Sequence, residues 1–488
     1  MKMGKTSKVL LLVGEIIVIF VVVFAGLFVL MKTIGGGMRK EKQTTGTPVS
    51  ATPVTLSRTP TPVSGERDLN GLTVTVTNWW DMDFNKPKDE YEQAYWDMQN
   101  EAMKKYNYTL VNDSHYDWGY EYTEAFLLGV NENHPIGSIV CLYNNFVAPL
   151  LQSNALLDVS KLPSADWNDE KYNQAVIDMM SFNGAIYGFA SGIEPRAGVF
   201  FNKGMLESCG YSRDLPYELQ ASGQWDFAHF KELCKNLTRD VDNNGVTDLY
   251  AVTAYSGIAI EAFLAANGTS VIVKDGDNGL KLNADDKRVT EALSFFHDLC
   301  QEGYYRIQRE DETWDYFKEC FAYGEVVMLV EEQYQCEDFH HNWNPDLDFG
   351  FVTMPKGPSA DDYYGVLREN VWVLPNCEAI RSVADDIVFV YDIYTDSPAG
   401  MENDDRRWKK NLYLDSLDNR AINETSNWLI NKWDYCMPYM DTYIMDWDYS
   451  WAYKIGDGKN PQAVLAAYSD EWQQEVDEFN RRMKEIAP

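Results

Sequence analysis

The chain is poor in cysteine and in positive charge. Its eight cysteines are widely spaced, with Cys320 and Cys336 as the nearest pair, so the sequence has no Cys-x-x-Cys redox or zinc pair. Lysine and arginine total 42 against 75 aspartate and glutamate residues, which gives a net charge of −33. A surface this acidic repels nucleic acid and anionic lipid, so we expect no nucleic-acid partner.

The common catalytic motifs are also missing. The sequence contains no Gly-x-Ser-x-Gly, Gly-x-x-x-x-Gly-Lys, His-Glu-x-x-His or Gly-x-Gly-x-x-Gly pattern. His340 and His341 stand beside acidic residues, but neighbours on a strand point to opposite faces, so a solvated loop is expected there. The sequence therefore predicts that the protein is not an enzyme. A glycoside hydrolase stays open as an alternative, because it needs only two carboxylates about 5–10 Å apart.

The N-terminus carries one long apolar run. Val9–Met31 spans 23 residues with a single charge, Glu15, which is enough helix to cross a hydrocarbon core of about 30 Å. The following residues, Leu30–Gly35, lack the small-x-small exit of a cleaved signal peptide. Residues 1–40 are therefore predicted to be a retained membrane anchor, with its helix at about 9–31. Lysines flank the helix on both sides and do not set its orientation.

A change of composition separates this anchor from the rest of the chain. Residues 43–65 contain seven Thr, four Pro and three Ser, and residues 41–68 are predicted to be a disordered linker. Extended at about 3.1 Å per residue, the 23-residue tract would reach roughly 70 Å. Residues 71–488 exceed the size of one core, so at least two lobes are expected.

The first part of the globular region alternates between strands and helices. The pattern predicts a strand at Leu72–Thr77, a helix at Glu90–Tyr106, a strand at Ile136–Leu142 and a further segment at Val147–Asp158. Such an order is typical of an α/β protein with a parallel sheet. Ligands of these sheets bind beyond the carboxyl ends of the strands. The polar and aromatic residues at these ends are Trp79, Trp80, Asp81, Tyr143, Asn144 and Asn145.

Aromatic residues make up 14% of the chain, with 15 Trp and 30 Tyr. Most of them will serve ordinary packing. An acidic, two-lobed domain rich in Trp, Tyr, Asn and Asp nevertheless has what sugar recognition requires, since flat rings stack on pyranoses and amides or carboxylates bind hydroxyls.

Residues 240–248 match the start of a calcium-binding loop. Oxygen-bearing residues occupy relative positions 1, 3, 5 and 9, a glycine stands at 6, and position 7 offers a backbone carbonyl. The predicted ligands are Asp240, Asp242, Asn244, Val246 and Asp248. Position 12 departs from the motif, because Ala251 replaces the usual glutamate. Structural Ca²⁺ is expected here, and an Asp- and Asn-rich turn without metal is the alternative.

Several segments in order resemble the sugar-binding group of the extracellular solute-binding proteins of ABC importers, family 1. The first is the stretch 184–203, which resembles the family's first crossing between lobes. Others follow the family's order along most of residues 71–375: 138–140, 150–159, 225–238, 321–328 and 350–358. This sequence departs from the family at Ala190, where a proline is usual, and after Met328, where Glu332 and Tyr334 replace a glycine and a tryptophan.

The resemblance implies a two-lobed periplasmic-binding-protein fold of type II. Lobe one would comprise residues 71–190 and 368–415, and lobe two residues 195–366 and 416–488. A carbohydrate would lie between the lobes, and ABC permease subunits would be the membrane partners of a monomeric protein. Beyond the strand ends named above, the implied ligand contacts are Glu194, Arg196, Tyr255, Ser256, Tyr334, Trp447 and Trp451.

The character of the domain places it outside the cell membrane, on a single-pass N-terminal anchor. Lipid-anchored relatives carry a cysteine just after the apolar region, whereas the first cysteine here is Cys141. Two other functions stay open: a membrane-tethered glycoside hydrolase, and a sensor ectodomain that presents its ligand to a receptor.

Overall fold

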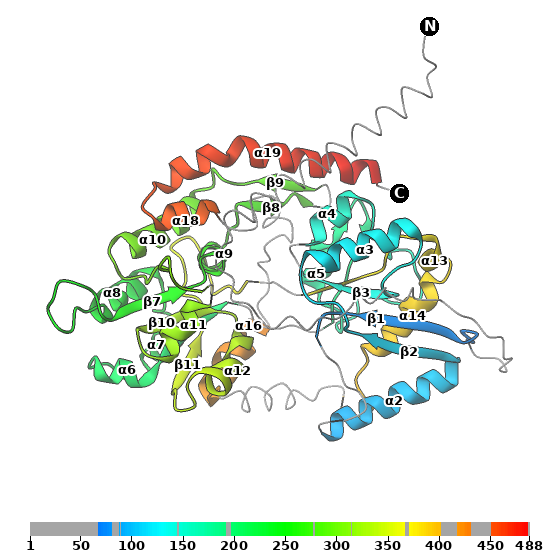
Figure 1. Cartoon of the computed structure of the whole chain (residues 1–488), viewed down its shortest axis with the longest axis horizontal. Coiled ribbons are helices and arrows are strands. Elements are labelled where there is room, and N and C mark those ends of the chain that lie inside the picture. The colour runs from blue at the N-terminus through cyan, green and yellow to red at the C-terminus, as the bar shows by residue number, and fades with distance from the viewer. Residues whose placement is uncertain are drawn as a thin grey trace, which may run out of the picture. The chain divides into compact units, whose positions relative to one another are not determined.

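Two four-stranded sheets organise the computed structural model (Figure 1). It describes residues 67–80, 87, 89–143, 146–191, 197–276, 279–313, 315–366, 370–401, 417–430 and 450–486. All of these residues belong to one compact unit.

The first sheet has the strand order β12-β3-β1-β2. Its strands are β1 (Leu72–Thr77), β2 (Tyr108–Asp113), β3 (Ile139–Leu142) and β12 (Val371–Val373). β1 is parallel to β2 and to β3, whereas β12 runs antiparallel to β3. The carboxyl ends of β1, β2 and β3 therefore share one edge, and β12 begins at that edge because Val371 pairs with Leu142.

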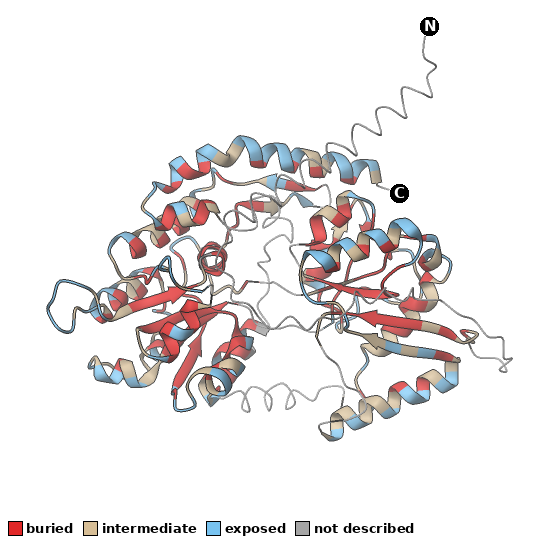
Figure 2. Ribbon diagram, viewed as in Figure 1, coloured by how far each residue is buried: buried red, intermediate tan, exposed pale blue. Residues whose placement is uncertain are grey.

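Helices cover both faces of this sheet. They are α2 (Glu90–Tyr106), α3 (Tyr120–Glu132), α4 (Val147–Gln152), α5 (Gln174–Met179), α13 (Glu378–Arg381) and α14 (Ala384–Tyr394). Apolar residues of α2 and α14 join one buried cluster with β1, while those of α3, α4 and α5 join another. Figure 2 shows β1 and β3 buried between these helices, whereas β2 at the edge of the sheet is partly exposed.

Local signals account for the helix ends. The Asp89 carboxylate accepts a hydrogen bond from the Glu92 N–H at the start of α2, which satisfies one of the free donors of the first turn. Lys104 and Lys105 lie in the last turn, where the helix dipole favours cations. The chain then turns through Asn107, at φ 54°.

The second sheet has the order β11-β6-β10-β7. Its strands are β6 (Gly198–Asn202), β7 (Tyr250–Ala254), β10 (Val326–Glu331) and β11 (Phe349–Val352). β10 is parallel to β7 and antiparallel to β6, and Glu331 pairs with Gly198. The carboxyl ends of β7 and β10 therefore lie at the edge where β6 begins. A Cβ on Gly198 would come within 2.4 Å of the Phe351 ring, so only glycine fits this entry point.

Helices of different lengths follow the strands of the second sheet. The helices are α6 (Lys203–Ser208), α7 (Leu215–Ala221), α8 (Phe227–Leu237), α9 (Ser256–Ala266), α10 (Lys287–Gln301), α11 (Tyr316–Ala322), η3 (Gln333–Gln335), α12 (Cys336–Asp338), η4 (Phe339–Trp343), η5 (Ala421–Ser426), α16 (Asn427–Ile430), α18 (Ser450–Gly456) and α19 (Pro461–Ile486). Two hairpins complete the fold: β4 (Ser181–Phe182) with β5 (Ala185–Ile186), and β8 (Ile272–Lys274) with β9 (Leu280–Leu282).

The long helix α19 contacts elements on both sides. It packs on α10, α18 and β9, and it also contacts α4 beside the first sheet. In Figure 1 it runs in red above the β8–β9 hairpin. The Phe479 ring meets the Phe182 ring of the β4–β5 hairpin, and the Asn183 side chain donates to the Met483 carbonyl. The C-terminal helix therefore bridges the two lobes.

The two-lobed α/β architecture is confirmed. The strand at Leu72–Thr77 and the helix at Glu90–Tyr106 have the predicted bounds, whereas β3 begins at Ile139, three residues later than predicted. The predicted loop at His340–His341 was wrong, because both lie in the helical turn η4. The lobe boundaries given above stay a prediction.

The predicted membrane anchor and the state of the cysteines are considered next. None of the described helices is both long and apolar enough to cross a bilayer. The predicted anchor, 1–40, and the linker as far as residue 66 lie outside the described residues. The seven cysteines within the described ranges are free thiols, and six of them are buried.

Candidate functional site

Two tryptophans follow β1 at the carboxyl edge of the first sheet. Trp79 and Trp80 are half-buried, and their rings meet edge to face with centroids 5.3 Å apart. The Trp79 ring also rests against Tyr122 of α3 at 5.7 Å, and Trp80 lies 6.1 Å from Trp372 of β12. Both rings are therefore held by packing while part of their surface faces solvent.

Tyr122 supports Trp79 of this pair. Its hydroxyl donates to the backbone carbonyls of Cys141, at 2.8 Å, and Thr77, at 3.2 Å, so it ties the ends of β1 and β3 together. Burial raises the pKa of Tyr122 well above its usual value, so the phenol stays protonated and keeps this donor role.

A second aromatic group lies at the ends of β2 and β3. Tyr143 directly follows β3 and is half-buried, as predicted for a residue at a strand end. Its ring lies 5.6 Å from that of Trp118, which stands in the loop between β2 and α3 and is 50% exposed. Sequence reasoning missed Trp118, because it predicted neither β2 nor α3. The apolar residues Tyr108, Leu110 and Val111 just after a helix were the available signal.

The second sheet offers tyrosines at the same type of edge. Tyr255 follows β7, forms the N-cap of α9 and has its ring 6.3 Å from Phe317. Tyr334 lies in η3 just after β10 and is 43% exposed. Its hydroxyl accepts a hydrogen bond from the Gln335 side chain at 3.0 Å. These two predicted contacts thus lie beyond the carboxyl ends of adjacent parallel strands.

Three buried polar side chains directly precede Tyr334 in the sequence. Glu331, Glu332 and Gln333 are all less than 7% exposed. Gln333 accepts a hydrogen bond from the Ser426 hydroxyl of η5, which fixes one wall of this region. Buried carboxylates and amides of this kind can hold hydroxyl groups once water is displaced.

Ser191 and Ala197 lie at the two carboxyl edges and are close in the sequence. Phe189 pairs with Trp372 of β12, and β6 begins at Gly198 beside the end of β10. Ser191 and Ala197 are the last and first described residues on either side of residues 192–196. Six residue steps can span at most about 22 Å, so Ser191 and Ala197 lie within that distance of each other.

The other predicted contacts do not form part of this described surface. Asp81, Asn144, Asn145, Glu194, Arg196 and Trp447 lie outside the described residues. Ser256 begins α9, but its side chain is not described. Trp451 needs a correction: it is fully buried in α18 with its ring 5.5 Å from Trp472, so in this structure it packs the core and is not available to a ligand.

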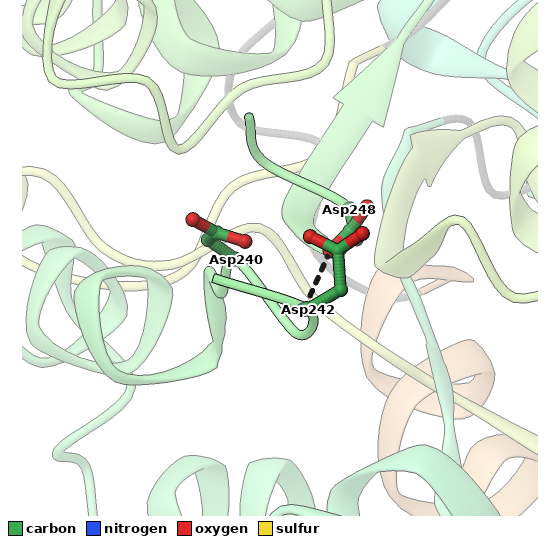
Figure 3. Close-up of side chains that lie close together, drawn as sticks. All are labelled: Asp240, Asp242 and Asp248. Atoms are coloured by element: carbon green, nitrogen blue, oxygen red, sulfur yellow. Dashed lines mark hydrogen bonds between the residues drawn. The ribbon is translucent and has the colours of Figure 1, made fainter. Parts of the chain in front are cut away.

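The predicted calcium loop lies between α8 and β7, away from the strand ends just described. Figure 3 shows the carboxylates of Asp240, Asp242 and Asp248 gathered around one space. One oxygen of each lies within 4.8 Å of the others, and all three residues are exposed.

Backbone donors hold this loop in its shape. The Asp240 carboxylate accepts from the N–H groups of Asn244, at 3.1 Å, and Gly245, at 2.7 Å. The Asp248 carboxylate accepts from the Val241 N–H at 2.7 Å. Three carboxylates at this spacing repel one another, and a hard divalent cation with oxygen ligands would relieve that repulsion. The donor set therefore fits calcium.

Comparison with known proteins identifies the type of protein. Residues 98–381 match a family profile described as bacterial extracellular solute-binding protein. No curated protein sequence matches the chain significantly.

Solved structures share the fold at low sequence identity. One is an extracellular solute-binding protein of Staphylococcus aureus in complex with maltose, at 14% identity and a TM-score of 0.57, covering 83% of this chain and 98% of that one. The GacH receptor of Streptomyces glaucescens, solved with acarbose, has 13% identity, a TM-score of 0.57 and the same coverage.

A third similar structure was solved with a different kind of ligand. UgpB of Mycobacterium tuberculosis, in complex with glycerophosphocholine, has 14% identity, a TM-score of 0.56 and coverage of 83% and 98%. The profile match spans more than half of the sequence and confirms the resemblance read from its motifs. The chain belongs to the family of bacterial extracellular solute-binding proteins.

Proposed function

We propose that this protein binds a carbohydrate, specifically an oligosaccharide, between the carboxyl edges of its two sheets. The observation that carries this proposal is the presence of partly exposed aromatic rings at both edges. Trp79, Trp80 and Tyr143 supply them on the first sheet, and Tyr255 and Tyr334 on the second. Rings facing a ligand from two sides would stack on the apolar faces of its pyranoses.

The charge of the chain favours a neutral ligand. The first 70 residues hold nine Lys and Arg against four Asp and Glu, which leaves a net charge of −38 on residues 71–488. Glu331 and Glu332 are buried and lie just before Tyr334 in the sequence. An anionic solute would be repelled, whereas sugar hydroxyls can donate to carboxylates.

The solved relatives support a sugar without fixing it. Two of the three named above were solved with maltose and with acarbose, and the third with glycerophosphocholine. Glycerophosphocholine is a second candidate ligand, because a quaternary ammonium binds over aromatic faces and beside carboxylates. Both classes therefore belong in the same binding screen.

We also propose that the protein is a monomer that delivers its ligand to the permease subunits of an ABC importer. Residues 1–40 would anchor it in the cell membrane, with the binding domain outside. It would carry out no catalysis. Copurification of permease subunits would support transport over sensing. Release of reducing ends from an oligosaccharide would instead indicate the hydrolase.

Ligand-dependent melting of the full chain tests the central proposal. The detergent should have no sugar headgroup, since an alkyl maltoside would compete with the ligand. The panel should contain α- and β-linked gluco-oligosaccharides and glycerophosphocholine. A ligand at 100 times its dissociation constant stabilises by about 2.7 kcal/mol, or about 3 °C for a domain of this size. Stabilisation by glycerophosphocholine alone would contradict the carbohydrate proposal.

We further propose that the loop at 240–248 binds Ca²⁺ and that the ion is structural. Asp240, Asp242 and Asp248 would supply side-chain oxygens, with Asn244 and the Val246 carbonyl completing the set. Asp242→Asn keeps the side-chain shape and removes one charge. Asp470→Asn is a matched control, because Asp470 is an exposed residue on α19.

A further inference from the structure

The loop between β2 and α3 brings one tryptophan to the carboxyl edge of the first sheet. Because β2 is parallel to β1, this loop leaves the sheet beside the segment that carries Trp79 and Trp80. Trp118 immediately precedes Gly119, whose φ of 141° turns the chain into α3. A residue with a side chain would be strained at that angle, so the glycine sets where the Trp118 ring is presented.

Trp118 is held in place although half of its surface is exposed. Its ring lies 5.6 Å from Tyr143, with the two planes at 76°, and 5.8 Å from Phe146. Phe146 is 7% exposed and contacts Tyr143 and Tyr120 as well. Trp118 and Tyr120, at 50% and 52% exposure, are therefore the exposed members of an aromatic cluster with a buried base, which we call the Trp118 cluster (Trp118, Tyr120, Tyr143 and Phe146).

Exposure alone would not distinguish Trp118 from other surface aromatics. Tyr323 is 64% exposed and also rests on another ring, that of Trp343. It precedes β10, however, and so lies at the amino edge of the second sheet. Single exposed rings are common in proteins. Trp118 differs because two neighbouring loops bring further aromatic rings to its own edge.

The rings that contact Trp118 differ from those that contact Trp79, although Tyr116 of the same loop packs on Tyr122. Trp79 contacts Trp80 and Tyr122, whereas Trp118 contacts Tyr143 and Phe146. The two groups arise from different loops along one edge. Two ring surfaces in such an arrangement suit a ligand that presents more than one apolar ring face.

We propose that Trp118 provides a second stacking position on the first lobe, so that the site holds at least two pyranose rings of a neutral oligosaccharide. The proposal rests on the proposed oligosaccharide-binding function and adds to it a second ring-binding position on the first lobe, at Trp118. Trp79 and Trp80 would hold one ring and Trp118 another.

Titration calorimetry of the full chain tests this proposal with variants Trp118→Ala and Trp118→Phe. The probes are glucose, the series from maltose to maltohexaose and the series from cellobiose to cellohexaose. Trp118→Ala should weaken binding of the longest bound oligosaccharide by roughly 10- to 100-fold, and Trp118→Phe should restore most of it. The ratio of the affinity for the longest bound oligosaccharide to the affinity for glucose should also be smaller in Trp118→Ala than in the unchanged protein.

Tyr323→Ala is the matched control, and it should bind like the unchanged protein. Melting without ligand should be nearly the same for all variants, because the altered rings are at least half exposed. If the unchanged protein binds an oligosaccharide and Trp118→Ala binds it equally well, the stacking proposal is overturned while the proposed function stands. Loss of binding by Trp118→Phe together with a lower melting temperature would also overturn stacking. If the unchanged protein binds none of the saccharides, both proposals fall.

Discussion

Replacing Tyr334 by alanine should weaken ligand binding by roughly 30-fold without unfolding the protein. A tyrosine buries about 200 Å² when fully covered, so the 43% of Tyr334 that is exposed leaves about 90 Å² for a ligand to cover. At about 25 cal/mol per Å², this area corresponds to about 2 kcal/mol, or roughly 30-fold in the dissociation constant.

Two further variants separate the ring from its hydroxyl and from general surface effects. Tyr334→Phe keeps the ring and removes the acceptor of the Gln335 hydrogen bond, so it should lose only a small part of the affinity. Tyr323→Ala removes a more exposed ring at the opposite edge of the second sheet and should change nothing.

The assay is titration calorimetry with an oligosaccharide found by melting, with the melting temperature of each variant measured alongside. Equal affinity of Tyr334→Ala and Tyr323→Ala would refute the placement of the ligand beside β10. A large fall in melting temperature for Tyr334→Ala would contradict the assignment of its ring to ligand binding, because it would show that the ring stabilises the fold.

Three other predictions follow from different parts of the chain. Chelation of calcium should lower the melting temperature of the unchanged protein but not that of Asp242→Asn; no change in either would make the loop a simple turn. Mass spectrometry of the native protein should detect peptides from residues 1–40, whereas a mature N-terminus near residue 35 or 44 would contradict a retained anchor. Burial alone would raise the pKa of Glu312 and Glu325, but hydrogen bonds from the 1% exposed Arg306 lower both values. A carboxylate whose pKa is lowered by folding stabilises the folded state above its ordinary pKa, and this stabilisation is lost as the pH falls. Arg306→Met should therefore lower the free energy of unfolding at pH 7 by about 3 kcal/mol and make stability decline less steeply between about pH 5 and 3. An acid-unfolding profile that is unchanged in Arg306→Met would contradict this.

The sequence was informative where a pattern was local. The alternation of Leu72–Thr77 and the capped, periodic helix Glu90–Tyr106 predicted both elements at their observed bounds. The clusters Trp79–Trp80 and Tyr143 were placed at strand ends for the same reason. Parallel strands bring such ends to one edge, so the candidate site on the first sheet followed from strand order alone.

Other features depended on contacts that a sequence pattern does not display. The apolar part of β2 is short, from Tyr108 to Val111, and it is followed by Asn112 and Asp113, so the strand and its loop with Trp118 were missed. Tryptophan is a residue type common in ligand sites, but the Trp451 ring packs against Trp472. The two residues are 21 positions apart, and helix periodicity alone does not predict that they pair. Glu331 ends β10 and Glu332 directly follows it, and both side chains are buried, which their charge alone does not predict.

Hydroxyl-radical footprinting of the full chain tests the central claim most directly, because it labels exposed tryptophan and tyrosine side chains. The measurement compares labelling with and without a saturating oligosaccharide chosen from the melting screen. The account predicts protection at Trp79, Trp80 and Tyr143 of the first lobe together with Tyr334 of the second, while Tyr323 keeps its labelling. Protection confined to one lobe, or equal protection of Tyr323, would contradict a ligand held between the two carboxyl edges.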